Sequence, residues 1–192
     1  QGLEGLVEKD PALRPFASMD GNLFYPHILE NDGIWDKKTG NLRKALIKDL
    51  NKMNEKIGLK PDIYYGLLSM DGDRMGALLQ DNKDLKADIS QAIAEFSRAA
   101  PDIIEAHDGT VIYVGGEDVL AIFPVTTAVE AAIAIKNLYE ERFMPLKNLK
   151  GSATISAAII FAHHYTPLNM IYQKIQELLD SKAKEECGRA SL

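Results

Sequence analysis

The segment that most constrains the fold is a short hairpin signal near the middle of the chain. Two apolar runs, Val111–Val114 and Val119–Phe123, flank the tetrapeptide Gly115–Asp118. A glycine pair between two short apolar runs is typical of a tight β-hairpin. The pattern therefore predicts two antiparallel strands whose connecting tip carries the carboxylates of Glu117 and Asp118.

A second acidic turn follows an earlier apolar run. The segment 63–70 is almost continuously apolar, as in a strand covered on both faces, and Asp71 and Asp73 come directly after it. Each acidic turn alone is a weak signal, because such turns are common on protein surfaces. Together, two acidic sites at strand ends predict a pair of divalent metal ions, Mg²⁺ or Mn²⁺, and chemistry on a nucleotide phosphate.

The order of predicted elements indicates the fold class. Hydrophobic periodicity predicts helices over 42–57, 85–103, 128–139 and 167–184, and strands over 63–70, 111–114, 119–123 and 152–162. The order from the first strand on is β-α-β-β-α-β followed by a helix, which predicts an α+β, ferredoxin-like domain with an extra C-terminal helix. We assign residues 1–60 to an irregular lead-in and a packing helix, and 61–192 to this domain.

Local signals mark several helix ends. Gly58 is expected to stop the first helix, and Pro101 to break the second. Thr127, or Thr126 before it, is an N-cap candidate for the third helix. The last helix is expected to begin at Pro167, which follows Thr166 as its N-cap.

Composition limits the functions that this chain can have. The chain has 192 residues, 46% of them hydrophobic and 26% charged, which describes an ordinary globular protein. Its net charge of -6 disfavours binding to a long nucleic-acid backbone. It does not exclude binding of a nucleotide whose phosphates are bound to a metal ion. Cys187 is the one cysteine, so an internal disulfide and a cysteine zinc site are excluded, and we predict a cytoplasmic protein.

Tracing the strand directions brings the candidate residues together. The ends of the first strand and of the hairpin fall at one edge of the sheet, with Asp71, Glu117 and Asp118. The last helix ends at the same edge, with Lys184 and Arg189. Cations at a helix C-terminus also complement its dipole, so a structural role and phosphate binding both remain open for these two residues.

The turn after Asp71 is a candidate phosphate site. Its backbone N–H groups lie at the entrance to a helix, and glycines allow close approach of a ligand. The nucleotide contacts expected from this turn and from the hairpin are Gly72, Asp73, Arg74, Met75, Gly76, Gly115 and Gly116.

Two histidine motifs receive simpler interpretations. His107-Asp108 is read as a turn, since the further ligands of a metal-dependent phosphohydrolase are not evident. His163-His164 ends a strand, where neighbouring side chains point to opposite faces, so we expect a solvated or partner-facing role.

These residues resemble a known family. The matching segments are Tyr64–Gly76, Val111–Pro124, Ser156–Ala158, Ala162–Leu168 and Leu178–Arg189. They look like the strand, hairpin, later strand, loop and final helix of the palm domain in the large subunit of type III CRISPR effector complexes, the Cmr kind in particular. The resemblance runs from about residue 40 to the end. The combination of the five segments is specific to this family, whereas no single segment is.

The resemblance implies a nucleotidyl transfer. That palm domain is related to GGDEF-type diguanylate cyclases and nucleotidyl cyclases, and it makes cyclic oligoadenylate from ATP when target RNA is bound. By resemblance, two Mg²⁺ or Mn²⁺ ions would be held by Asp71, Gly72, Glu117 and Asp118. The partners implied are other CRISPR effector subunits with guide RNA and target RNA.

The sequence departs from the family pattern in two respects. Glu117 stands where the family usually has aspartate, and the family's nuclease domain, zinc site and second palm-like unit are absent from these residues. We therefore expect a palm piece of a longer protein, truncated at both ends. Two alternatives remain: a GGDEF-like diguanylate cyclase that uses GTP, and a catalytically silent palm that binds nucleotide or scaffolds the complex.

Overall fold

The computed structural model describes residues 10, 14–17, 24–31, 39–58, 62–186 and 190–191. The chain divides into two units, Gln1–Asp62 and Ile63–Leu192. Arg189 and several of the predicted N-terminal turns lie outside the described residues. The helices and strands are α2 (Arg14–Ala17), α3 (Pro26–Glu30), α4 (Gly40–Ile57), β1 (Tyr64–Gly72), α5 (Met75–Asp81), η3 (Lys83–Leu85), α6 (Lys86–Ala106), β2 (Thr110–Gly115), β3 (Asp118–Pro124), α7 (Ala128–Phe143), β4 (Ile155–His163), α8 (Leu168–Glu177) and the π-helix η4 (Leu178–Glu186).

The first unit is built around α4. Its buried side chains Leu50 and Met53 pack against Leu29 of α3. The helix ends where predicted, at Gly58, whose φ of 71° is left-handed and suits a residue without a Cβ. The predicted packing helix is therefore present, and it has its own small core.

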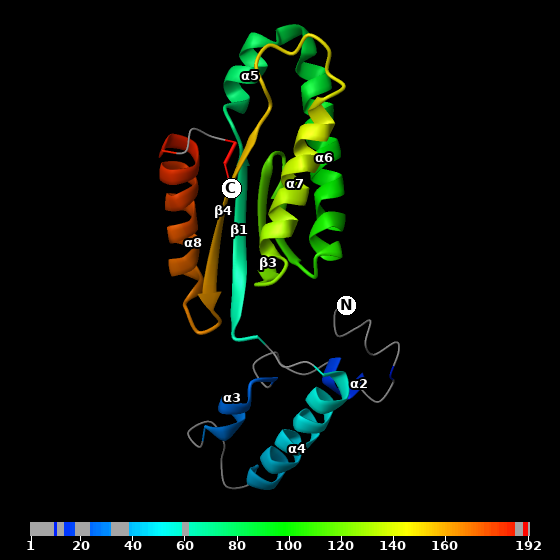
Figure 1. The fold of residues 1–192 in the computed structure, drawn as a ribbon, viewed down its shortest axis with the longest axis vertical. Helices are drawn as coiled ribbons and strands as arrows, with labels where there is room; N and C mark the ends of the chain where they lie inside the picture. The colour runs from blue at the N-terminus through cyan, green and yellow to red at the C-terminus, as the bar shows by residue number, and fades with distance from the viewer. Residues whose placement is uncertain are drawn as a thin grey trace. The chain divides into compact units, whose positions relative to one another are not determined.

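The second unit contains one four-stranded sheet in the order β2-β3-β1-β4. The strand β1 pairs antiparallel with both β3 and β4, and β2 pairs antiparallel with β3. This is the strand order of the ferredoxin-like split motif, and the α+β prediction is confirmed. Figure 1 shows the sheet between α6 and α7 on one side and α8 on the other.

Both faces of the sheet are covered, which explains the continuous apolar run of β1. Alternate residues of a strand point to opposite faces. Leu68 and Met70 belong to the large core that includes α6 and α7, whereas Leu67 belongs to a smaller core with α8 and η4. By the same alternation, Ser69 and Asp71 point to the face of the sheet that α8 covers.

Two of the predicted helix boundaries are wrong. Helix α6 continues through Pro101 without a break. A proline inside a helix costs about 3 kcal/mol, and we attribute its tolerance here to Ala100 and Ile104, which flank it and are fully buried. The last helix begins at Leu168 with Pro167 as its N-cap, one residue later than expected. Thr127 is the N-cap of α7, but its hydroxyl donates to the carbonyl of His107, at 2.7 Å, and not to the helix.

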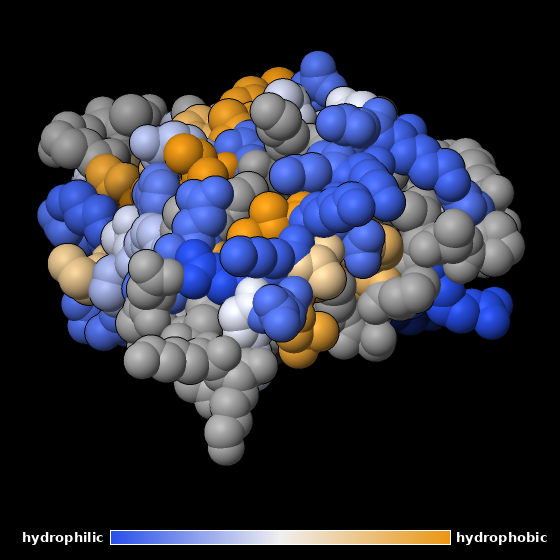
Figure 2. Space-filling view, turned by 90° about the horizontal axis from the view of Figure 1, so that it is seen from below, coloured by the Kyte–Doolittle hydropathy of each residue, from blue (hydrophilic) through white to orange (hydrophobic). Residues whose placement is uncertain are grey.

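The surface mixes polar and apolar residues. Figure 2 shows hydrophobic residues in several separate patches among hydrophilic ones on the face drawn. In the part of the chain that the structure describes, no helix has the length and apolar character needed to cross a membrane.

The two histidine motifs lie away from the acidic edge. His107 and Asp108 form a turn after α6, as predicted, and Asp108 has a φ of 58°. The expectation that His163 and His164 point apart is wrong: their ring centroids are 4.7 Å apart, because His164 lies in the turn after β4 and not in the strand.

Candidate functional site

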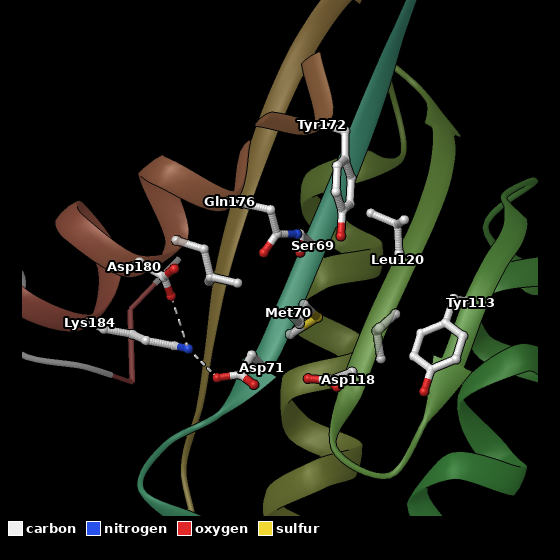
Figure 3. A pocket seen from close by; sticks show the side chains of 12 residues that line it. Ser69, Met70, Asp71, Tyr113, Asp118, Leu120, Tyr172, Gln176, Asp180 and Lys184 are labelled. Carbon is white, nitrogen blue, oxygen red and sulfur yellow. Dashed lines mark hydrogen bonds and ion pairs between the residues drawn. The ribbon is translucent and has the colours of Figure 1, made fainter. Parts of the chain in front are cut away.

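The strand register brings two aspartates together at one edge of the sheet. Met70 of β1 lies opposite Val119 of β3, and the next position along each strand is Asp71 and Asp118. Residues opposite each other on antiparallel strands share a face. Both carboxylates therefore point to the α8 side of the sheet, as Figure 3 shows.

The two carboxyl groups interact strongly. Burial, a hydrogen bond with Asp71 and the negative charges of Asp71 and Glu117 raise the pKa of Asp118 to about 6, although the charge of Lys184 lowers it. Two carboxylates this close do not both ionise readily. The pair thus has an excess of negative charge that a cation can relieve.

Lys184 supplies part of that positive charge. Its ammonium forms ion pairs with Asp71 and, at 3.4 Å, with Asp180. Burial lowers the pKa of Lys184, but the hydrogen bonds and charges of the two aspartates outweigh this effect and the pKa is raised overall. The ammonium is therefore charged and directed at the carboxylate pair from the end of η4.

A cavity of about 380 Å³ opens beside the aspartates. Its polar and aromatic lining includes Ser69, Tyr113, Tyr172 and Gln176. The Gln176 amide donates to the Ser69 hydroxyl at 3.2 Å, which joins α8 to β1. Figure 3 shows Tyr113 and Tyr172 on the β2–β3 side of this hollow and Lys184 and Asp180 across from them.

Sequence reasoning missed most of this lining. Ser69 and Gln176 have no sequence motif, and they meet only because α8 folds across the sheet. The signal that was available is alternation along β1, which places Ser69 on the same face as Asp71.

Glu117 is separate from the aspartate pair. It is absent from the lining of this cavity, and its side chain packs over Gly72. A Cβ on Gly72 would lie 2.7 Å from Cγ of Glu117 and 3.0 Å from the hydroxyl of Tyr139. Within the described ranges, no group of three or more His, Cys, Asp or Glu side chains is arranged to hold a metal. The two hairpin carboxylates therefore lie on different sides of the hairpin tip.

Asp73 is buried and already bonded. Its carboxylate accepts hydrogen bonds from the hydroxyls of Thr154 at 2.7 Å and Ser156 at 2.8 Å, and from the N–H of Ala190 at 3.0 Å. Its own N–H donates to the carbonyl of Thr154 at 2.8 Å. This side chain ties the end of β1 to β4 and to the C-terminal segment.

The rest of the turn after Asp71 is divided between core and surface. Met75 is buried in the large core, whereas Arg74 and Gly76 are exposed. Arg74 is left-handed, with a φ of 53°, and it lines a second cavity of about 440 Å³ together with Lys150. The structure thus leaves Arg74 and Gly76 open to solvent, while Met75 between them is buried.

The hairpin tip shows why glycines are needed there. Gly115 pairs with Asp118, so the turn consists of Gly116 and Glu117. Gly116 has a φ of 65°, which a residue with a Cβ rarely adopts. The Ser97 hydroxyl of α6 donates to the Gly116 carbonyl at 3.0 Å and holds the tip in place.

The fold and the paired aspartates define a palm-type domain, and comparison with solved structures agrees. The Csm1–Csm4 cassette in complex with pppApA matches with a TM-score of 0.56 and 22% identity, over 66% of this chain and 20% of that one. The same cassette in complex with AMPPNP matches with a TM-score of 0.56 at 20% identity over the same shares. The apo Csm1–Csm4 cassette matches with a TM-score of 0.52 and 23% identity.

Sequence comparison gives the family. The family model for the second palm domain of Cas10/Cmr2 matches residues 64–192. The CRISPR system Cmr subunit Cmr2 of Pyrococcus furiosus is 30% identical over an aligned length of 208 residues, gaps included, and the alignment covers 91% of this chain and 23% of that protein. The chain therefore belongs to the Cas10/Cmr2 family, as the resemblance indicated, and the family model assigns residues 64–192 to the second palm domain. It spans about a quarter of the length of the Cmr2 relative.

Proposed function

We propose that this palm domain binds ATP with two divalent metal ions and joins adenylates through 3′–5′ bonds into cyclic oligoadenylate. The observation that carries the proposal is the Asp71–Asp118 pair, which lies beside a cavity and is faced by Lys184. Support comes from the similar Csm1–Csm4 cassettes that were solved in complex with AMPPNP, pppApA and cA3.

The donor atoms fit Mg²⁺ or Mn²⁺. Magnesium is usually held by one or two carboxylates together with substrate phosphates and water. Asp71 and Asp118 supply the carboxylates, the main-chain carbonyl of Gly72 is a further oxygen donor, and Glu117 is a candidate for a second ion. The raised pKa of Asp118 supports this role, because a cation would relieve the repulsion between the pair.

The cationic and backbone donors would hold the triphosphate. Lys184 faces the carboxylate pair, and the start of α5, where Gly76 is exposed, has N–H groups without partners inside the helix. Arg74 is exposed beside this turn and suits phosphate oxygens. Asp73 is assigned a supporting role through its internal hydrogen bonds, and Arg189 stays a prediction from the sequence alone.

The cavity would hold the base. The rings of Tyr113 and Tyr172 line it, and the Gln176 amide and Ser69 hydroxyl can form directional hydrogen bonds. Leu120 and Leu179 add an apolar part to this otherwise polar lining. Selection of adenine over guanine would depend on these two polar groups.

The proposed reaction is a nucleotidyl transfer. A ribose 3′-hydroxyl of one nucleotide attacks the α-phosphorus of another, the bond to the bridging oxygen breaks, and pyrophosphate leaves. Repetition lengthens the chain, and attack by the terminal 3′-hydroxyl on the 5′ α-phosphate closes the ring. Bound divalent ions supply charge neutralisation and lower the pKa of the hydroxyl. Asp71 and Asp118 fix the geometry, and Lys184 neutralises charge on the leaving group.

In the full-length protein, this chemistry would belong to a type III CRISPR complex. We propose a cytoplasmic large subunit that assembles with other effector subunits and guide RNA, and that starts synthesis when target RNA binds, as antiviral defence. The similarity to a Csm1–Csm4 subcomplex of the type III-A interference complex supports this assembly.

Labelled nucleotide distinguishes the candidate reactions. The chain, alone and in a reconstituted complex, is incubated with labelled ATP or GTP and Mn²⁺ or Mg²⁺, and the products are separated by chromatography. Cyclic oligoadenylate is expected from ATP, and Asp71→Ala and Asp118→Ala should each abolish it. Cyclic diguanylate from GTP, or turnover that survives both substitutions, would contradict the proposal.

One observation favours a silent palm as the second candidate. Lys184 already neutralises Asp71, and the described residues hold no three-member acidic group. A silent palm would bind ATP with an affinity that depends on Asp118, but it would release no pyrophosphate in the reconstituted complex.

A further inference from the structure

Tyr139 is the strongest unexplained feature of the structure. It lies on α7, on the opposite side of the sheet from the cavity, and it is fully buried. Within the described residues, its hydroxyl is a buried oxygen without a hydrogen-bond partner. A buried hydroxyl left unsatisfied costs about 1–3 kcal/mol, so its presence requires an explanation.

Packing does not explain the hydroxyl. The Tyr139 ring makes an edge contact with Phe96, at 5.0 Å between centroids, and a tilted contact with Phe143 at 4.9 Å. A phenylalanine ring would make both contacts. The aromatic cluster therefore fixes the ring, and the oxygen serves something else.

The hydroxyl is directed at the acidic edge. A Cβ on Gly72 would meet both the Tyr139 oxygen, at 3.0 Å, and the side chain of Glu117. Because Gly72 has no Cβ, the Tyr139 hydroxyl and the Glu117 side chain can both pack against its backbone. Burial first, and then the negative charges of Glu117, Asp73 and Asp71, raise the pKa of Tyr139. A phenol hydroxyl can donate a hydrogen bond, and this one lies beside the Glu117 side chain.

We propose that Tyr139 is a positioning residue whose hydroxyl donates a hydrogen bond, directly or through one water, to the Glu117 carboxylate and so presents Glu117 to a metal ion. The terminal torsion of a glutamate is soft, and a small rotation of Glu117 brings an oxygen to the phenol. Groups that hydrogen-bond to metal ligands orient them and typically change metal affinity by 10–100-fold. This inference rests on the proposed function, because it assigns Glu117 to one of the two ions.

Conservative variants of the full 192-residue chain test the proposal. Mn²⁺ binding is titrated by electron paramagnetic resonance in the presence of a non-hydrolysable ATP analogue. Tyr139→Phe should weaken Mn²⁺ binding about 10-fold or more, and its melting temperature should stay close to that of the original chain, because the ring contacts with Phe96 and Phe143 are kept. Tyr65→Phe, at the far end of β1, is the matched control and should bind as the original chain does.

A double-mutant cycle tests the partner. Glu117→Gln should weaken Mn²⁺ binding, and adding Tyr139→Phe to it should cause little further loss, because the two residues act as a unit. Wild-type affinity in Tyr139→Phe, or additive losses in the double variant, would overturn the inference. If Asp118→Ala abolishes Mn²⁺ binding but Tyr139→Phe leaves it unchanged, the proposed function stands and the role of Tyr139 is overturned. If the original chain binds no Mn²⁺, both are overturned.

Discussion

Asp71 and Asp118 face each other across the β1–β3 ladder, one position beyond the Met70–Val119 pair, and their carboxyl groups are within hydrogen-bonding range. The relationship follows from antiparallel register and not from a flexible loop, so the spacing of the two groups is set by the sheet. Rigid strands position a metal site more accurately than loops do. The same register directs Met70 and Val119 into the core behind the site.

The pH dependence of folding stability should reveal the repulsion between Asp71 and Asp118. The pKa of Asp118 rises from 3.8 in the unfolded chain to about 6 in the folded one. The folded state therefore binds the proton more tightly, and stability falls as pH rises between these two values. Asp118→Asn should be more stable than the original chain at neutral pH, and the difference should vanish near pH ~4. Urea denaturation of the metal-free chain across this range measures it, and a constant difference would contradict the assignment.

Substitution of Lys184 should change both the affinity for ATP and the pKa of Asp118. Its charge lowers the pKa of Asp118, so Lys184→Met should raise that pKa above about 6 and shift the pH midpoint of Mn²⁺ binding upward. ATP affinity should fall about 10-fold if the ammonium contacts phosphate. Lys174→Met is the matched control, since Lys174 is on the same helical segment and pairs with Glu177 at the surface. Equal behaviour of the two variants would show that Lys184 is only structural.

Gly72 should tolerate no side chain. In Gly72→Ala, the new Cβ would lie 2.7 Å from Glu117 and 3.0 Å from the Tyr139 hydroxyl, so the backbone or both side chains must move. We expect a loss of roughly 1–3 kcal/mol in the free energy of unfolding. Gly76→Ala is the control: open space surrounds that position on α5, and a gain of about 0.5–1 kcal/mol is expected. Chemical denaturation should show that the free energy of unfolding falls in Gly72→Ala and rises in Gly76→Ala.

Asp73 should prove to be a stability residue. Asp73→Ala leaves the hydroxyls of Thr154 and Ser156 and the N–H of Ala190 without their acceptor. The expected loss is about 2–4 kcal/mol. Asp102→Ala, at an exposed position of α6, should change stability by less than about 0.5 kcal/mol. A small effect at Asp73, measured by urea denaturation, would show that its bonds are replaced by water.

Local signals were sufficient for much of the fold. Gly116 requires a left-handed turn, and the apolar runs beside it fix the hairpin register within a residue or two. The continuous apolar run of β1 indicated a strand buried on both faces, which the two cores confirm. Local propensity was misleading at Pro101, because burial of the residues around it outweighs the lost hydrogen bond.

The sequence by itself determined the order of the elements, the hairpin and the edge at which the acidic residues collect. Period-two and period-3.6 patterns and glycine turns are encoded within a few residues of each other. Only the tertiary structure decided that Asp118 joins Asp71 while Glu117 turns toward Tyr139, that Asp73 is used internally, and that Gln176 meets Ser69. These contacts join residues distant in the chain, and they depend on packing geometry and on the competition between burial and charge, which no local pattern records.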